Sequence, residues 1–222
     1  MKIALVSKKN RWFEQILSSL HGEHTVIPIH HKGDLETSLA IHSPDWVFVF
    51  HWSYIIDKSI YSKYKCVSFH TGNLPNDRGG SPIQNQILNG KKFSRVNAIV
   101  VQDPVDSGAV YCSKEISLQG SLQDIWGVIT DSVITLIQHC IINNPTPIEQ
   151  VGSSTTYKRK KDNILKLTDI ESIYNQIRML DGESYPNTCL EIDGFKLDFS
   201  RATMDGNQIL SDVRIYKIWT ST

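Results

Sequence analysis

Short runs of consecutive apolar residues, each followed by a helical pattern or a turn, constrain the fold of this chain more than any other feature. Such runs are typical of strands that are buried on both faces, as in parallel sheets. Their alternation with helical spacing predicts an α/β fold with a mostly parallel sheet and crossover helices. The predicted strands are 3–6, 25–29, 46–50, 66–69, 97–101 and 110–116, and the predicted helices are 12–20, 35–41, 82–88 and 122–142.

The chain changes character after the turn sequence Asn-Asn-Pro-Thr-Pro at 143–147. A polar segment and a helical pattern over 169–180 follow it, and Asp193-Gly194 is a strong signal of a hairpin. We therefore predict an α/β core over 1–150 and, over 151–222, a linker helix with a small β-rich subdomain. The predicted strands of this subdomain are 188–192, 195–199 and 213–219.

Composition excludes several classes of protein. The chain has 222 residues with 23 Lys+Arg and 23 Asp+Glu, so its formal charge is zero. A broad nucleic-acid-binding face usually needs a basic surplus, and the apolar runs that begin at residues 3, 46 and 98 are too short for a membrane span or a signal peptide. The four cysteines are scattered, which favours reduced thiols without a metal site. We expect a cytoplasmic protein that binds neither nucleic acid nor a membrane.

Two loops that follow predicted strands contain the residues best suited to chemistry. In the segment 68–85, His70 stands at the end of a predicted parallel strand, where ligands of open α/β sheets bind. Taken alone, the pattern fits a histidine at the edge of the core equally well. In the segment 102–109, Asp103 and Asp106 lie in a Gly/Pro loop, for which a surface turn is the default interpretation.

Together the two segments, H-x-x-x-L-P-x-x-R-G-x-x-P and D-x-x-D-S-G, resemble the folate-dependent formyltransferase family. That family includes methionyl-tRNA, glycinamide-ribonucleotide and nucleotide-sugar N-formyltransferases. The separation of 36 positions between His70 and Asp106 matches the family's spacing, and the resemblance is best over 46–142. It implies a Rossmann-like formyltransferase core, a one-carbon transferase activity, and N10-formyltetrahydrofolate as co-substrate with no metal.

The resemblance implies catalytic roles for three residues. His70 and Asp106 match the family's histidine and aspartate, whereas Ser68 stands where the family has an asparagine that helps to hold the carbonyl oxygen. A serine hydroxyl donates one hydrogen bond but is shorter. Three alternatives stay open: Ser68 suffices, another donor such as Asn73 or a backbone N–H assists, or activity is low.

A finer resemblance concerns the acceptor. A longer motif is similar to that of short nucleotide-sugar N-formyltransferases of the pseudaminic-acid type. It reads F-H-x-x-x-L-P-x-x-R-G-G-S-P-x-Q-N and is preceded by H-W-S-x-x-I. It implies a UDP-linked 4-amino-4,6-dideoxy-sugar acceptor, of the N-acetyl-altrosamine type. The implied folate-binding residues are His51, Trp52, Ser53, Tyr54, Gln102, Asp103 and Val105. The implied substrate-binding residues are Asn73, Arg78, Gly79, Gly80, Ser81, Tyr157 and Arg159.

Other interpretations remain beside this one. The basic run 158–161 is either a solvated face or a contact for a diphosphate, and Lys8, Lys9 and Arg11 offer further cations. The short chain and zero charge disfavour a transfer-RNA acceptor, and the lack of glycine over 7–11 disfavours glycinamide ribonucleotide. A dTDP-amino-sugar acceptor, an inactive folate- or nucleotide-binding protein, and a formyl-folate hydrolase are the alternatives. Exposed strands in the tail suit a homodimer.

Overall fold

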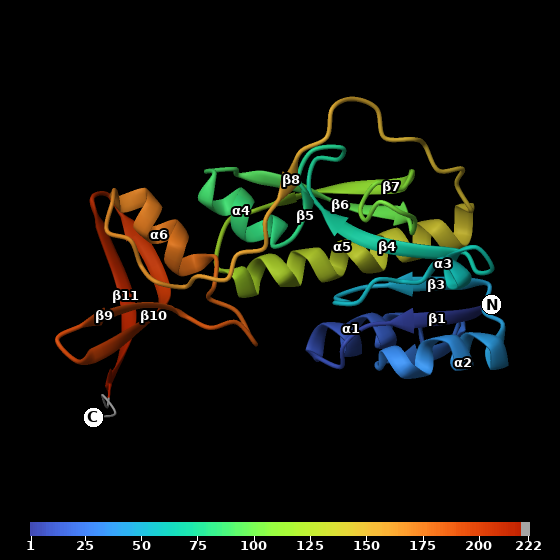
Figure 1. Ribbon diagram of the computed structural model, residues 1–222, viewed down its shortest axis with the longest axis horizontal. Helices are drawn as coiled ribbons and strands as arrows, with labels where there is room; N and C mark the ends of the chain where they lie inside the picture. The colour runs from blue at the N-terminus through green and yellow to red at the C-terminus, as the bar shows by residue number, and fades with distance from the viewer. Residues whose placement is uncertain (219–222) are drawn as a thin grey trace.

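A six-stranded sheet forms the centre of the N-terminal part of the chain in the computed structural model, which describes residues 1–218 (Figure 1). The strand order is β2-β1-β3-β4-β6-β7. The first four of these strands are parallel, and β6 and β7 pair antiparallel, which confirms the predicted α/β class. The strands are β1 (Lys2–Val6), β2 (Thr25–Ile29), β3 (Trp46–Val49), β4 (Cys66–Thr71), β6 (Phe93–Val100) and β7 (Val110–Ser117).

Helices cover both faces of the sheet, which explains why its first strand is a continuous apolar run. In β1, Ile3 and Leu5 enter one buried cluster with α1 (Arg11–Leu20) and α5 (Leu122–Asn143). Ala4 and Val6 enter a second cluster with α2 (Lys32–His42) and α3 (Lys58–Tyr61), because successive side chains of a strand point to opposite faces. The helix α4 (Pro82–Leu88) joins the first cluster.

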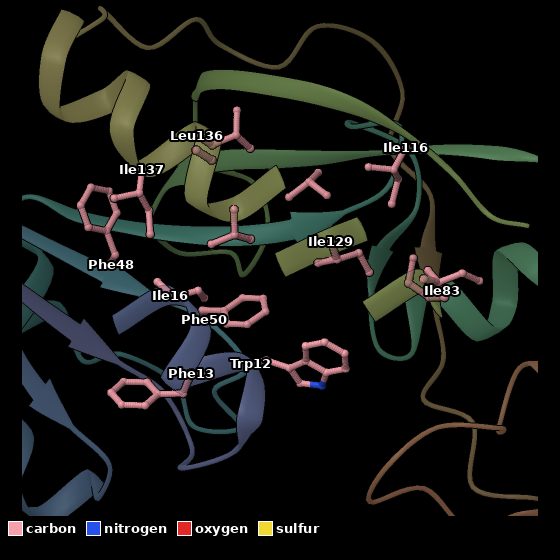
Figure 2. Packing of buried hydrophobic residues seen from close by; sticks show 14 of the residues in the cluster. Trp12, Phe13, Ile16, Phe48, Phe50, Ile83, Ile116, Ile129, Leu136 and Ile137 are labelled. Carbon is pink, nitrogen blue, oxygen red and sulfur yellow. The ribbon is translucent and has the colours of Figure 1, made fainter. Parts of the chain in front are cut away.

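Figure 2 shows the first cluster from close by, with Phe48 and Phe50 from the sheet side, Phe13 and Ile16 from α1, and Ile129 from α5. Aromatic rings give this cluster much of its buried area, since each aromatic side chain buries about 150–250 Å². The cluster therefore fixes α1 and α5 against the face of the sheet whose carboxyl edge carries the site described below.

The helix α5 has a property that the sequence interpretation overlooked. Within residues 1–218 it is the one helix that is long and apolar enough to cross a membrane by length and composition alone. Nine of its 22 residues are buried against the rest of the protein, and core helices often share this composition. A capping box between Ser121 and Asp124 begins the helix and satisfies its first free N–H groups.

The chain returns from α5 to the core before it forms the C-terminal subdomain (Figure 1). A two-residue strand, β8 (Thr156–Tyr157), pairs in parallel with β5 (Arg78–Gly79), a pairing too short to be predicted. The subdomain contains α6 (Ile170–Arg178) and an antiparallel sheet of order β11-β10-β9. Its strands are β9 (Thr188–Ile192), β10 (Phe195–Asp205) and β11 (Gln208–Lys217).

The Asp193-Gly194 hairpin is confirmed, but the strands 195–199 and 213–219 were predicted with the wrong bounds. The long strands β10 and β11 continue to the turn at 206–207, because the pairing resumes at Thr203 and Leu210 after a bulge. The sequence pattern did not predict these longer strands because residues 200–201 and 211–212 are polar. An exposed sheet face accepts polar side chains, so the strands continue through them. Trp219 lies outside the described residues.

We expect Leu39→Ala to destabilise the protein by about 2–5 kcal/mol, because Leu39 is fully buried between α2 and the sheet. Ile41→Ala, on the same helix at 71% exposure, serves as the control and should change stability by about 0.5 kcal/mol or less. Urea denaturation followed by circular dichroism measures both values. Equal losses in the two variants would contradict this packing.

Candidate active site

The imidazole of His70 is held between two oxygen atoms at the carboxyl end of β4. Its Nε2 lies 2.7 Å from the backbone carbonyl oxygen of Asp77, which can only accept, so Nε2 carries a proton. Its Nδ1 lies 3.4 Å from Oδ1 of Asp106. The imidazole side chain is 7% exposed and the carboxylate 16%, so the pair is largely shielded from water. The structure thus brings together residues that are 36 positions apart in the sequence.

Asp106 is fixed by its own network. The Gly79 N–H donates to its Oδ2 at 3.1 Å, and the Gln150 side-chain amide donates to its backbone oxygen at 2.9 Å. Arg78 in turn donates through Nε and Nη2 to the Gln150 oxygen. Burial raises the pKa of Asp106, but the hydrogen bond and charge of His70, the Gly79 N–H and the Arg78 charge outweigh it, so the pKa lies below its usual value. The carboxylate is therefore ionised near neutral pH.

The backbone of this loop is strained and tightly packed. Asp106 has a φ of +61°, a conformation that costs an L-residue about 1–3 kcal/mol and that clusters at functional sites. Two residues later, a Cβ added at Gly108 would lie 1.8 Å from the Val100 carbonyl oxygen, so only glycine fits there. This close approach sets the position of the Asp106 loop against β6.

Asp77 organises the loop that holds His70 from the other side. Its side chain is 4% exposed and pairs with Lys91 Nζ at 2.7 Å, while the Asn73 N–H donates to the same carboxylate. Its own N–H donates to the Thr155 hydroxyl. Burial raises the pKa of Asp77, but the hydrogen bonds from Lys91, Asn73 and Tyr157 and the Lys91 charge bring it below the usual value.

A cavity of about 480 Å³ opens beside His70 and Asp106. Its walls are largely apolar and aromatic, as is usual for a site that holds a flat heterocycle. The indole N–H of Trp52 is buried in this wall and has no hydrogen-bond partner within residues 1–218. Other lining residues include Val49, Phe50, His51, Ser53, Tyr54, Ser68, Phe69, Gly79, Gly80, Val100, Gln102, Val105, Trp126, Ile129 and Arg159.

A second cavity of about 380 Å³ adjoins the first. It lies where the loop after β1 meets the loop after β3, and the strand order changes direction between these strands. Ligands of open α/β sheets bind at such switch points. Lys8 and Lys9 from the first loop and Arg159 supply three cations, and Glu183 supplies one carboxylate. The residues His51, Trp52, Ser53 and Arg159 line both cavities.

The structure places most of the predicted site residues around the first cavity, and five elsewhere. Among the five, Arg78 binds Gln150 instead of facing the cavity, and the Tyr157 hydroxyl accepts a hydrogen bond from Asn89. The Ser81 hydroxyl accepts from the Lys160 N–H, and Asp103 and Asn73 are exposed. In the basic run 158–161, Arg159 is the residue that reaches the cavities. The five residues outside both linings are Asn73, Arg78, Ser81, Asp103 and Tyr157.

Sequence reasoning missed several residues that build the site. Gln150 lies in a coil and carries no local signal, since its role comes only from where the return segment crosses the Asp106 loop. Trp126 occupies an apolar position of a predicted helix and cannot be told from a core residue. Asp77 stands in the correct loop, but a buried aspartate paired with a distant lysine looks like any turn aspartate.

Fold and geometry define a class: an α/β protein with a histidine–aspartate pair at the carboxyl edge of its sheet. The family model of the methionyl-tRNA formyltransferase C-terminal domain matches residues 159–216. A solved structure, "Methionyl-tRNA formyltransferase from Clostridium thermocellum", is 31% identical with a TM-score of 0.92 and covers 98% of this chain and 99% of its own. The chain belongs to the formyltransferase family.

Other relatives bear on the branch of the family. A methionyl-tRNA formyltransferase of Campylobacter curvus is 29% identical over 72% of this chain and 55% of its own length. The chain spans about half the length of the curated relatives it matches. A sugar N-formyltransferase from Shewanella shares the fold at 15% identity and a TM-score of 0.68, covering 90% and 96% of the chains. The predicted nucleotide-sugar branch is therefore not confirmed.

One more structure shares the fold, that of HypX from Aquifex aeolicus in complex with tetrahydrofolic acid. It is 15% identical with a TM-score of 0.72, and it covers 91% of this chain and 38% of its own.

We expect Lys91→Gln to destabilise the protein by about 1–3 kcal/mol near neutral pH, because it leaves the buried Asp77 carboxylate without its cation. The pKa of Asp77 is lower in the folded state, so its stabilisation is present above the usual aspartate pKa. That stabilisation is lost as the pH falls through the folded value. The stability difference should therefore shrink below about pH 4.

Urea denaturation at pH 7 and at pH 3 measures this difference. Lys92→Gln is the matched control, because Lys92 is the exposed neighbour of Lys91. A difference that stays constant across this pH range would show that the ion pair does not stabilise the loop.

Proposed function

We propose that this protein transfers a formyl group from N10-formyltetrahydrofolate to a primary amine. The observation that carries the proposal is the His70–Asp106 pair, 3.4 Å apart at the wall of a largely apolar cavity of about 480 Å³. Family membership supports the same chemistry, since the Clostridium thermocellum structure is named a formyltransferase.

The first cavity fits the pterin of the folate. Phe50, Trp52 and Trp126 give it aromatic walls, and the unpartnered Trp52 N–H offers a donor to a heterocycle. The loop 102–106 forms another part of the wall. HypX, whose structure contains tetrahydrofolic acid, shares this fold. When bound, the folate supplies the formyl carbon and N10 as leaving group.

The residues of the pair supply the route for a proton. In the proposed reaction the amine nitrogen bonds to the formyl carbon, the bond from that carbon to N10 breaks, and one proton passes from the amine to N10. Asp106 lines the cavity and accepts the proton that leaves the amine. Because Nε2 of His70 donates to the Asp77 carbonyl, Nδ1 is the ring nitrogen that shares this proton with Asp106 before it passes to N10. The ionised Asp106 stabilises the charged ring, and Ser68 lines the same cavity as a donor to the carbonyl oxygen.

The second cavity fits the acceptor, which we propose to be a nucleotide-linked amino sugar such as a UDP-4-amino-4,6-dideoxy sugar. Lys8, Lys9 and Arg159 suit the diphosphate, and the shared wall leads from this cavity to His70. A compact cluster of cations on a chain of zero net charge suits a small anionic ligand better than a long nucleic acid.

Methionyl-tRNA is the second candidate acceptor, favoured by the names of the relatives at about 30% identity and by the matched C-terminal domain. The deciding assay offers N10-formyltetrahydrofolate with UDP- and dTDP-amino sugars or with charged initiator tRNA, and detects the formylated product by mass spectrometry. Transfer to tRNA alone would overturn the sugar proposal. Binding without any product would overturn the transferase proposal, and formate release without an acceptor would indicate a hydrolase.

The remaining expectations on environment and assembly stay proposals: a cytoplasmic enzyme that forms a homodimer through its β subdomain. Ile192 and Phe195 form a cross-strand pair there, and Ile215 on β11 is 63% exposed. A sedimentation-velocity measurement at the protomer mass would contradict the dimer.

We expect His70→Ala to lower kcat by about 10²–10³-fold, because it removes a hydrogen-bonding and proton-exchanging group from the reaction centre. Asp106→Asn should lower kcat by a similar factor, since an amide cannot stabilise a charged imidazole. Folate affinity should change less than tenfold in both variants. His139→Ala, an exposed histidine on α5, is the control with unchanged kcat. Steady-state rates near the wild-type value in either site variant would refute the assigned roles.

A further inference from the structure

Asn10 has its side-chain amide oriented by the helix it begins. Its Oδ1 accepts a hydrogen bond of 2.9 Å from the Phe13 N–H and so caps α1. The other end of the same amide, Nδ2, must then point away from the helix. It lies 3.0 Å from Nδ1 of His51, a residue 41 positions away.

This orientation determines which nitrogen of His51 carries a proton. An amide nitrogen donates and cannot accept, so His51 Nδ1 is the acceptor and has no proton. A neutral imidazole with a bare Nδ1 carries its proton on Nε2. The N-cap of α1 therefore selects the Nε2–H tautomer of His51.

The surroundings keep this ring neutral and fixed. Burial, with the charge of Lys8 as a smaller contribution, lowers the pKa of His51 to about 4. The ring centroid lies 4.2 Å from that of Trp126 and 5.4 Å from that of Phe50, and the residue adopts a φ of +52°. The charged groups that share its second cavity are Lys8, Lys9, Arg159 and Glu183. Three of these four groups are cations, which disfavours a further positive charge.

His51 stands where the two cavities meet. It lines both of them. It is the second residue after β3, at the edge where the strand order changes direction. A ligand that extends from the cations of the second cavity toward His70 passes along this shared wall.

We infer that His51 determines acceptor specificity: its neutral Nε2–H donates a hydrogen bond to an uncharged oxygen of the acceptor, and Asn10 is the positioning residue that fixes this tautomer. The inference rests on the proposed function. Charged and uncharged groups of the acceptor then bind different residues. The phosphates bind the three cations, whereas a hydroxyl or carbonyl oxygen accepts a hydrogen bond from the neutral His51. This places the amine end of the acceptor toward His70.

Asn10→Asp and Asn10→Ser test the inference, because both residues are good N-caps and keep the oxygen that Phe13 needs. The aspartate accepts a hydrogen bond from His51 Nδ1, so it moves the proton to Nδ1 or charges the ring. The serine withdraws the donor without adding a charge. Two-bond ¹⁵N–¹H correlation spectra of the imidazole report the tautomer, and they require no substrate.

We expect the spectra to show the Nε2–H tautomer in the wild type and its loss in Asn10→Asp. KM for the UDP-amino sugar should rise severalfold in Asn10→Ser, which changes only the donor to His51, with kcat within about threefold. The rise should reach about tenfold or more in Asn10→Asp, because Asn10 also lines the second cavity and the added carboxylate repels the diphosphate. His51→Phe keeps the ring stack but not the donor, and should also raise KM about tenfold. Thermal unfolding, measured on each variant, shows whether the fold is retained.

A wild-type spectrum with the proton on Nδ1 would overturn the inference. An unchanged acceptor KM in Asn10→Asp, in spite of a moved proton, would overturn it equally. If the wild type formylates no amine, the proposed function fails on that assay alone. Calorimetric titration with the unreacted UDP-amino sugar then decides the inference, since equal affinity of wild type and Asn10→Asp, or no binding by the wild type, overturns it.

Discussion

The site depends on the contacts that hold both ring nitrogens of His70. The Asp77 carbonyl accepts a hydrogen bond from Nε2, and the Asp106 carboxylate faces Nδ1. Each of these oxygens belongs to a loop with a positive φ at that residue, and each loop is tied down by buried polar contacts. Contacts at both ring nitrogens, one from each loop, fix the orientation of the buried imidazole more firmly than either contact alone.

The parallel sheet brings these loops together. Parallel strands direct their carboxyl ends to one edge, so the loops after β1, β3 and β4 meet there although they are distant in sequence. The antiparallel strand β6 runs the other way and ends beside the beginning of β4, where Val100 pairs with Val67. The loop after β6 therefore turns back along β4 for Asp106 to reach His70. Strand direction thus accounts for the position of His70, whereas the position of Asp106 depends on the fold of its own loop, in which Gly108 packs against Val100.

What the sequence predicts well is local or periodic. The buried strands of the core, the Asp193-Gly194 hairpin and the loops after β4 and β6 follow from apolar runs and turn residues. Contacts that depend on where a distant segment crosses do not follow. Gln150 has no pattern of its own, and the orientation of Asn10 becomes informative only once Phe13 and His51 are seen around it.

The pairing of β5 with β8 has a consequence for the boundary between core and tail. Composition divides the chain near residue 150, but Arg78 and Gly80 donate their backbone N–H groups to Thr155 and Tyr157 across that division. A fragment that ends at residue 150 would leave these donors without partners and would lack Arg159 in both cavities. The smallest unit able to assemble the complete pocket therefore extends past the end of the α/β layer, into the segment that tethers the tail.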